Sequence, residues 1–428
     1  MANLTANVTS PAEALTSAPR PMPSRRSFAP TPRLWAVTAL VLILATGIFL
    51  RAYPSATYSR VGYDEHGYIV FMQQIEKAGL ANYGAVVQAY VEDQYRRPDA
   101  IVPATRIGFL VPAYLVGQLL NCSPFQALQA TSCLAAIMLL GVCAVFAYRA
   151  GGTVTMLSLT ALVATAPLQI YLSQRALIDG YFAFWAVAAL WLAWENLRHP
   201  RSWGWLSAYA FSLAVLVLTK ENAAFVVFAI FAVLVLNRFL RLGTMTPHLL
   251  VATIVGPAIA VLYLAWLVGG VWEWVEFYRM FVAKSRTNWY SIAAQDGPWY
   301  RYIVDFFLMS PVIVALAFGR IFQLRMSDRV DVFMTAFLGF SFLVMANVTY
   351  GMSLRYAAYW DIPLCWLALS QVTTMSRRLP QARRLLVIAG LVLALAAVGL
   401  VQYDRFFIEG AIYDPTTSAM ARATGLQK

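Results

Sequence analysis

The sequence has little charge and few of the residues that bind metals or build disulfide frameworks. Only 12% of its 428 residues are charged, and it contains three histidines and four cysteines. With 60% apolar residues, this composition excludes an ordinary soluble domain and is typical of a membrane protein with several spans. The cysteines lack paired spacing, so we interpret them as packing residues rather than disulfide partners or metal ligands. They are Cys122, Cys133, Cys143 and Cys365.

Acidic residues are also scarce, which leaves a formal charge of +12. We attribute this excess to the positive-inside bias of cytosolic loops and expect no nucleic-acid partner. Residues 1–33 are rich in Pro, Ser, Thr, Ala and Arg and predict a disordered basic tail in the cytosol. The apolar run Leu34–Leu50 follows without a cleavage site, which predicts an uncleaved first span.

Three apolar runs are about twice as long as a helical span of roughly 20 residues. They are Val154–Trp194, Trp203–Leu240 and Val332–Thr374. Each is interrupted by charged residues, so each is interpreted as a hairpin with the charged break at its turn. The breaks contain Arg175 and Asp179 in the first run, Lys220 and Glu221 in the second, and Arg355 and Asp361 in the third.

The segments between the hairpins are rich in arginine, which places them in the cytosol and the hairpin turns on the outer side. The result is an all-α polytopic domain over residues 34–402 with about eleven spans. A first outer loop covers residues 51–124, in which Ile107–Leu120 is expected to lie in the interface, and a short outer tail covers 403–428. The spans are Leu34–Leu50, Phe125–Tyr148, Val154–Leu172, Tyr181–Trp194, Trp203–Thr219, Ala223–Leu240, Leu249–Val271, Tyr302–Phe318, Val332–Asn347, Tyr356–Val372 and Leu385–Val401.

This topology gathers ionisable residues on the outer face. Ionisable groups at membrane depth tend to form ion pairs or to belong to functional sites. A carboxylate there can accept a proton from an acceptor hydroxyl, and Arg or Lys can hold a phosphate leaving group. The pattern favours group transfer from a lipid phosphate. The residues are Asp64, Glu65, Arg175, Asp179, Lys220, Glu221 and Arg355.

Five segments carry a resemblance to a known class of enzymes. The segment "GYDEHGY" (residues 62–68) resembles the Asp-Glu signature in the first outer loop of GT-C glycosyltransferases, in the protein O-mannosyltransferase and aminoarabinose-transferase branch. The others, which are similar to later parts of that fold, are "ATRIGFLVPAYLVGQLLNCSPF", "YLSQRALIDGYFAFW", "LTKENAAF" and "SLRYAAYWDIPL". The resemblance covers most of residues 34–370 and implies the GT-C fold.

The resemblance also implies a reaction: an inverting sugar transfer from a polyprenyl phosphate to a hydroxyl of a lipid, glycan or protein. Asp64 matches the catalytic base, and Glu65 would position the acceptor or a helix end. Arg355, with Tyr356 beside it, and Lys220 are candidates for the donor phosphate. Arg175 and Asp179 would shape the pocket.

The resemblance implies that the reaction requires no cofactor. A divalent cation stays open, because some members of the class use one, and Glu65 and His66 are weak candidates as its ligands.

Other interpretations remain open at this point. Asp64 and Glu65 favour a helix N-terminus whatever their function, and the spacing of Arg175 and Asp179 also suits a structural ion pair. The main rival function is a transporter or flippase of a lipid-linked sugar, although no repeated halves are visible. Short loops favour a bacterial inner membrane with the site facing the periplasm.

Overall fold

The described part of the chain is made of helices, with no strand among its residues, which confirms the all-α prediction. The computed structural model describes residues 32–53, 61–348, 351–410 and 415–425. Most of the basic tail expected over residues 1–33 lies outside them. Membrane-spanning backbone must satisfy its hydrogen bonds within the segment, which is why long apolar runs form helices.

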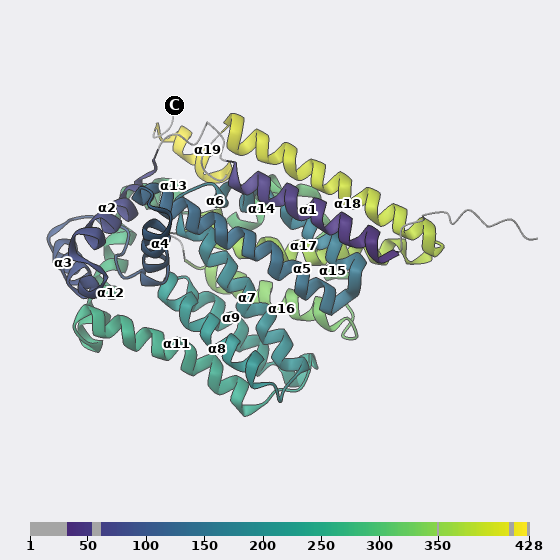
Figure 1. Cartoon of the computed structure of the whole chain (residues 1–428), viewed down its shortest axis with the longest axis horizontal. Helices are drawn as coiled ribbons and strands as arrows, with labels where there is room; N and C mark the ends of the chain where they lie inside the picture. The colour runs from purple at the N-terminus through teal and green to yellow at the C-terminus, as the bar shows by residue number, and fades with distance from the viewer. Residues whose placement is uncertain (1–31, 54–60, 349–350, 411–414, 426–428) are drawn as a thin grey trace, which may run out of the picture.

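Long helices, joined by several shorter ones, run alongside one another and form the body of the protein (Figure 1). The helices of this bundle are α1 (Pro32–Ala52), α5 (Pro124–Ala164), α6 (Pro167–Ser173), α7 (Ile178–Arg198), α8 (Trp203–Thr219), α9 (Ala223–Val235), α10 (Asn237–Leu240), α11 (Pro247–Val268), α14 (Arg301–Met309), α15 (Pro311–Phe322), α16 (Arg329–Met345), α17 (Asp361–Met375) and α18 (Gln381–Tyr403). A 3-10 helix, η3 (Leu354–Trp360), leads into α17, and two short elements, η4 (Ser376–Arg378) and η5 (Asp404–Gly410), flank α18.

Every segment of the eleven-span prediction falls on one or two of these helices. Four described helices, α1, α5, α11 and α18, are long and apolar enough to cross a membrane by themselves. The number of spans stays a prediction. Residues 125–172, predicted as two spans, include a break inside α5 at Gly152, whose φ of 75° is a backbone conformation that favours glycine.

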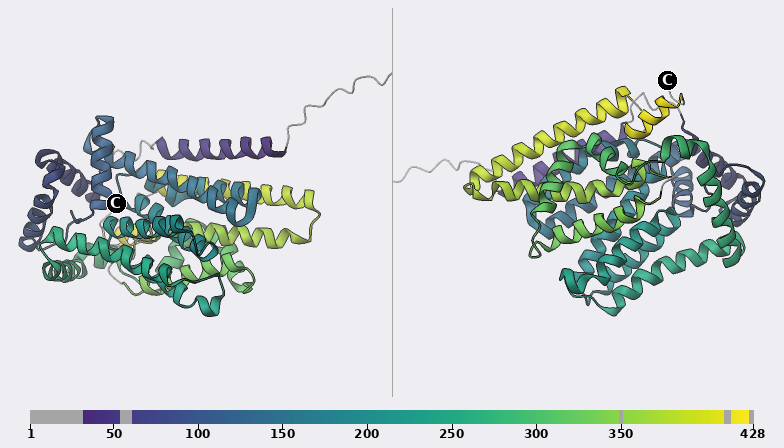
Figure 2. Two further views of the ribbon diagram at one scale, coloured as in Figure 1. Left: turned by 60° about the horizontal axis from the view of Figure 1, so that its bottom comes forward. Right: turned by 180° about the vertical axis from the view of Figure 1, so that it is seen from behind.

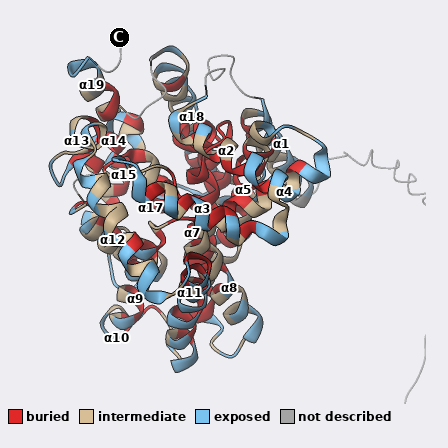
Figure 3. Ribbon diagram, turned by 90° about the vertical axis from the view of Figure 1, so that its left-hand side faces the viewer, coloured by how far each residue is buried: buried red, intermediate tan, exposed pale blue. Residues whose placement is uncertain are grey.

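Helix α7 forms the centre of the bundle. It is buried along nearly its whole length, and a helix that is apolar on all sides is expected in the interior. Its Trp191 stacks on Phe146 with ring centroids 5.3 Å apart and meets Trp366 edge-on at 5.4 Å. Seen from one end, buried residues occupy the middle and exposed ones the periphery (Figure 3).

The remaining helices gather at one end of the bundle, which we call the α2 end (Figure 1). They are α2 (Tyr63–Ala78), η2 (Leu80–Asn82), α3 (Tyr83–Arg96), α4 (Ile107–Leu120), α12 (Val271–Thr287), α13 (Trp289–Gln295) and α19 (Pro415–Ala423). Helix α4 runs across the direction of the bundle helices (Figure 2), an orientation that favours its predicted position in the interface. The predicted tail 403–428 is helical over α19, which packs on α13 and α14.

Candidate active site

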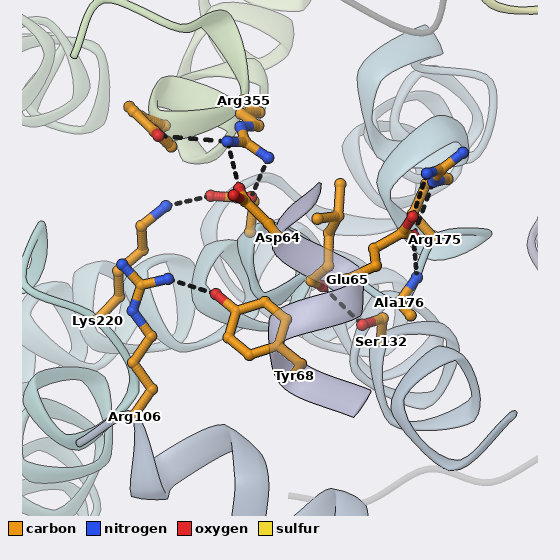
Figure 4. Close-up of polar contacts among 12 residues, drawn as sticks. Asp64, Glu65, Tyr68, Arg106, Ser132, Arg175, Ala176, Lys220 and Arg355 are labelled. Atoms are coloured by element: carbon orange, nitrogen blue, oxygen red, sulfur yellow. Dashed lines mark hydrogen bonds and ion pairs between the residues drawn. The ribbon is translucent and has the colours of Figure 1, made fainter. Parts of the chain in front are cut away.

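The acidic motif begins helix α2 at the α2 end. Gly62 is the N-cap residue, and its backbone N–H donates to the Glu65 carboxylate at 2.6 Å. Asp64 and Glu65 both lie in the first turn, where acidic groups favour the helix dipole. Neighbouring residues on a helix point in different directions, and the two carboxylates leave α2 on opposite sides (Figure 4).

Asp64 points into a cluster built from the predicted hairpin turns. Its Oδ2 accepts a hydrogen bond from Arg355 Nη2 at 2.6 Å, and Arg355 Nη1 lies 3.9 Å from Asp179 Oδ2. Arg355 Nη2 also donates to the Tyr356 hydroxyl at 3.3 Å. The side chains of Asp64 and Arg355 keep 27% and 21% of their surface exposed, so a ligand can reach this pair.

Lys220 supplies a second cation beside Arg355. Its Nζ donates to Asp179 Oδ1 and lies 3.9 Å from the centroid of the Tyr356 ring. Asp179 therefore bridges Lys220 and Arg355, and Tyr356 contacts both. Lys220 is the C-cap of α8 and Asp179 lies in the first turn of α7, so two turns that are about 40 residues apart in sequence meet at this point.

Two further residues, which the sequence analysis did not single out, also belong to this group. Arg106, the N-cap of α4, donates to the Tyr68 hydroxyl and forms a salt bridge to Glu221 with Nη2 and Oε2 2.8 Å apart. Tyr68 lies one helical turn after Asp64, so the i,i+4 spacing inside "GYDEHGY" is a signal that would have found it. We call the eight residues the outer ionic cluster: Asp64, Tyr68, Arg106, Asp179, Lys220, Glu221, Arg355 and Tyr356.

The charges of the cluster shift the pKa values of its members. Burial by itself would raise the pKa of Asp64, but Arg355 and Arg106 outweigh it and hold that pKa below its usual value. Burial lowers the pKa of Lys220 to about 8, opposed by Asp179 and supported by Arg106 and Arg355. At neutral pH, Asp64 is therefore ionised and Lys220 is largely a cation.

Glu65 faces a different environment. It forms a buried ion pair with Arg175, whose Nε donates to Glu65 Oε1 at 2.8 Å, and the backbone N–H of Ala176 donates to the same oxygen at 2.9 Å. The exposed fractions are 1% for the Glu65 side chain and 4% for that of Arg175. The structure thus pairs Arg175 with Glu65 and Asp179 with Lys220, whereas the sequence had placed Arg175 and Asp179 together as residues that shape the pocket.

The candidate metal ligands do not come together. Glu65 is engaged by Arg175 and two backbone amides, and His66 is exposed. Within the described residues, no group of three or more His, Cys, Asp and Glu side chains is arranged to hold a metal ion. The expectation that no cofactor is required, with a divalent cation left open, stays a prediction.

Comparison with known proteins finds similarity in structure but not in sequence. No protein-family model and no curated protein sequence matches the chain. Solved structures of GT-C glycosyltransferases do match its fold. The chain therefore has the GT-C fold of an integral membrane protein, which confirms the resemblance at the level of the fold.

Two solved structures illustrate the match. ArnT from Cupriavidus metallidurans, bound to undecaprenyl phosphate, is 14% identical with a TM-score of 0.55, and the alignment covers 92% of this chain and 76% of ArnT. The oligosaccharyltransferase AglB from Archaeoglobus fulgidus, in complex with an inhibitory peptide and a dolichol-phosphate, is 13% identical with a TM-score of 0.54. That alignment covers 90% of this chain and 56% of AglB, so the chain spans just over half of that protein.

Proposed function

We propose that the protein transfers a sugar from a polyprenyl-phosphate donor to a hydroxyl group of a lipid, glycan or protein acceptor. The observation that carries this proposal is the contact between Asp64 and Arg355, 2.6 Å apart and both partly exposed. It joins a carboxylate from the first loop to a guanidinium from a late turn. The fold is shared with proteins solved with undecaprenyl phosphate and with a dolichol-phosphate, which supports a lipid-phosphate donor.

Asp64 is the proposed catalytic base. An acceptor hydroxyl attacks the anomeric carbon, its proton passes to the Asp64 carboxylate, and the bond from that carbon to the phosphate oxygen breaks. The polyprenyl phosphate leaves with the bonding electrons, and the anomeric centre is inverted. The lowered pKa of Asp64 keeps the carboxylate ionised, and general-base catalysis of this kind contributes about 10²- to 10⁴-fold.

Arg355, Lys220 and Tyr356 are the proposed ligands of the donor phosphate. Arginine binds phosphate through two parallel N–H bonds, and Arg355 already presents Nη1 and Nη2 toward the two carboxylates Asp64 and Asp179. A donor phosphate would replace Asp64 as the partner of Nη2 and thereby release the base. Lys220 would add a point charge, and Asp179 would keep the two cations together.

The charge of the cluster favours the transfer step. It contains three cations, Arg106, Lys220 and Arg355, and three carboxylates, Asp64, Asp179 and Glu221. Because these charges balance, a bound phosphate adds negative charge. When Asp64 takes the acceptor proton, it removes one negative charge beside the phosphate that is leaving. Preorganised cations at such a site stabilise the charge that develops on the leaving group.

Residues 34–402 form the proposed catalytic domain, with the active site on the outer membrane face, which in a bacterial inner membrane is the periplasmic side. Glu65 and Arg175 fix the start of α2 and act on the reaction by positioning Asp64. The catalytic step as proposed requires no cofactor.

The experiment is to incubate the purified protein with a polyprenyl-phosphate sugar and candidate acceptors in detergent, where no bilayer separates two compartments. Transfer by the wild-type protein that is lost in Asp64→Asn supports the proposal. The contrary result is that the protein moves the donor lipid between the leaflets of proteoliposomes but transfers no sugar in either system. That result would mean that the protein is a flippase and not a glycosyltransferase.

A further inference from the structure

Arg301 is a buried cation outside the outer ionic cluster. It begins α14, and its side chain keeps only 1% of its surface exposed. Nη1 donates to the carbonyl of Asp296 at 2.6 Å, and Nη2 donates to the carbonyl of Ala294 at 2.8 Å. The buried charge also has an ionic partner, because Nε lies 3.7 Å from Asp305 Oδ2. With its two bonds to backbone carbonyls, Arg301 fixes the turn that follows α13.

The same guanidinium reaches α19. Arg301 Nη2 also donates to Thr417 Oγ1 at 2.7 Å, and Thr417 is buried. One turn along α14, Asp305 Oδ1 accepts from the backbone N–H of Thr416 at 3.0 Å, at the start of α19. The first amides of a helix lack partners within it and favour an acidic group. Arg301 and Asp305 thus attach α19 to α14 through a side chain and a backbone contact.

The Ala294–Asp296 turn, to which Arg301 donates, is also hydrogen-bonded to the segment before Arg355. The carbonyl of Gln295 accepts from the backbone N–H of Met352 at 2.9 Å. Tyr302, next to Arg301, donates through its hydroxyl to the carbonyl of Gly351 at 3.2 Å, and its ring meets Trp360 of η3 at 5.4 Å. These contacts fix both ends of the short stretch that carries Arg355.

We propose that Arg301 is a positioning residue for the donor site and that α19 holds Arg301 in place. The inference rests on the proposed function, since it concerns the affinity for the donor. Its physical basis is a continuous set of hydrogen bonds that runs from Thr417 through Arg301 and the Ala294–Asp296 turn to Met352, three residues before Arg355. Loosening Thr417 lets this stretch move, and Arg355 then holds its phosphate-binding orientation for less of the time.

The test compares three variants in α19 of the full-length protein. Thr417→Val removes the oxygen that accepts from Arg301 and keeps the side-chain shape. Thr417→Ser restores that oxygen. Arg422→Ala is the control, because Arg422 is exposed on α19 and its Nε donates to the Ser418 carbonyl of its own helix. The measurements are kcat and KM for a polyprenyl-phosphate sugar, and hydrogen exchange at the Met352 amide.

Thr417→Val should raise KM by about three- to tenfold, because it removes a hydrogen bond to a charged group and part of that loss reaches the donor site. The change in kcat should be smaller. Exchange at Met352 should accelerate, and Thr417→Ser and Arg422→Ala should resemble wild type in all three measurements. A uniform loss of folded enzyme would lower the amount of active protein without this division between KM and kcat.

Two results would overturn the inference: unchanged exchange at Met352 in Thr417→Val, or faster exchange with an unchanged KM. A wild-type protein that transfers no sugar and binds no polyprenyl phosphate would instead contradict the proposed function. The exchange measurement does not depend on activity, so it would still decide whether α19 stabilises the segment before Arg355.

Discussion

The two sides of helix α2 hold neighbouring carboxylates in opposite ways. On one side, Asp64 meets Arg355 in a partly exposed cluster in which cations and carboxylates share partners. On the other, Glu65 forms a buried pair with Arg175 and accepts from the amides of Gly62 and Ala176. The first arrangement can exchange a protein partner for a ligand. In the second, both oxygens of Glu65 already accept hydrogen bonds and the pair is buried, which suits a structural role.

This comparison shows how one short motif serves two purposes. A catalytic carboxylate needs an accessible oxygen and a fixed backbone, and these requirements conflict on a single side chain. Here they are divided between Asp64 and Glu65, because successive residues of a helix face different directions. Substitutions on the two sides should therefore separate activity from stability.

The largest expected effect is on the Asp64 side. Asp64→Asn keeps the shape and a hydrogen-bonding oxygen but cannot accept the acceptor proton, so turnover should fall by about 10²- to 10⁴-fold. Donor binding should survive, since Arg355 no longer has a competing carboxylate. The measurements are turnover and polyprenyl-phosphate binding in one detergent preparation. Full activity in Asp64→Asn, with Glu65→Gln inactive but folded, would move the base to Glu65.

On the Glu65 side, a substitution should chiefly lower the stability of the folded protein. Glu65→Gln removes the carboxylate charge that pairs with the buried Arg175, a change that typically destabilises a protein by about 3–5 kcal/mol. Thermal unfolding in detergent should show a lower transition temperature, while turnover per folded molecule should fall far less than in Asp64→Asn.

A matched double variant sharpens this test. Glu65→Gln combined with Arg175→Met removes both charges, and replacing a buried pair by apolar groups is often neutral or better. The double variant should therefore be more stable than Glu65→Gln alone. If the double variant were the less stable of the two, the pair would not be the source of the stability on this side of α2.

Much of this arrangement follows from the sequence, and the reason is physical. Apolar runs too long for one crossing of the membrane must contain a turn, and arginine-rich loops indicate which side is cytosolic. Together these rules bring Asp64, Lys220 and Arg355 to one end before any coordinates are known. The different directions of Asp64 and Glu65 also follow from helix geometry alone.

The pairings could not be obtained in the same way. Arg175 and Asp179 have helical i,i+4 spacing, yet Arg175 pairs with Glu65 and Asp179 pairs with Lys220. The partners are about 110 and 41 residues apart in sequence, and such choices depend on how helices pack. Arg106 was missed for the same reason: its salt bridge to Glu221 joins α4 to the turn after α8.

A smaller effect is expected at the donor phosphate. Arg355→Lys keeps the charge but loses the planar fork that contacts Asp64 and Tyr356 and that would bind phosphate through two bonds. KM for the donor should rise by about tenfold, the equivalent of one charge-assisted hydrogen bond. Kinetics at low and at saturating donor concentration check this, with unchanged thermal unfolding as the control for folding. Normal turnover at low donor concentration would remove Arg355 from the phosphate site.

The smallest expected effect is a pH dependence that belongs to Lys220. Its pKa is lowered to about 8, chiefly by burial, so the side chain is charged at pH 7 and mostly neutral at pH 9. If it contacts the donor phosphate, affinity should fall as pH rises through that range, by a factor of about five to ten for the loss of one charge-assisted bond. The measurement is polyprenyl-phosphate binding between pH 7 and pH 9.

Two substitutions of Lys220 assign this pH profile. Lys220→Arg carries a charge throughout the range, so its affinity should stay constant where that of wild type falls. Lys220→Met has no charge, so it should bind weakly at pH 7 and show no further loss at pH 9. A wild-type profile in Lys220→Met would mean that another group titrates. Lys220 would then serve to hold Asp179 beside Arg355, and the Asp64 side of α2 would contain one phosphate ligand fewer.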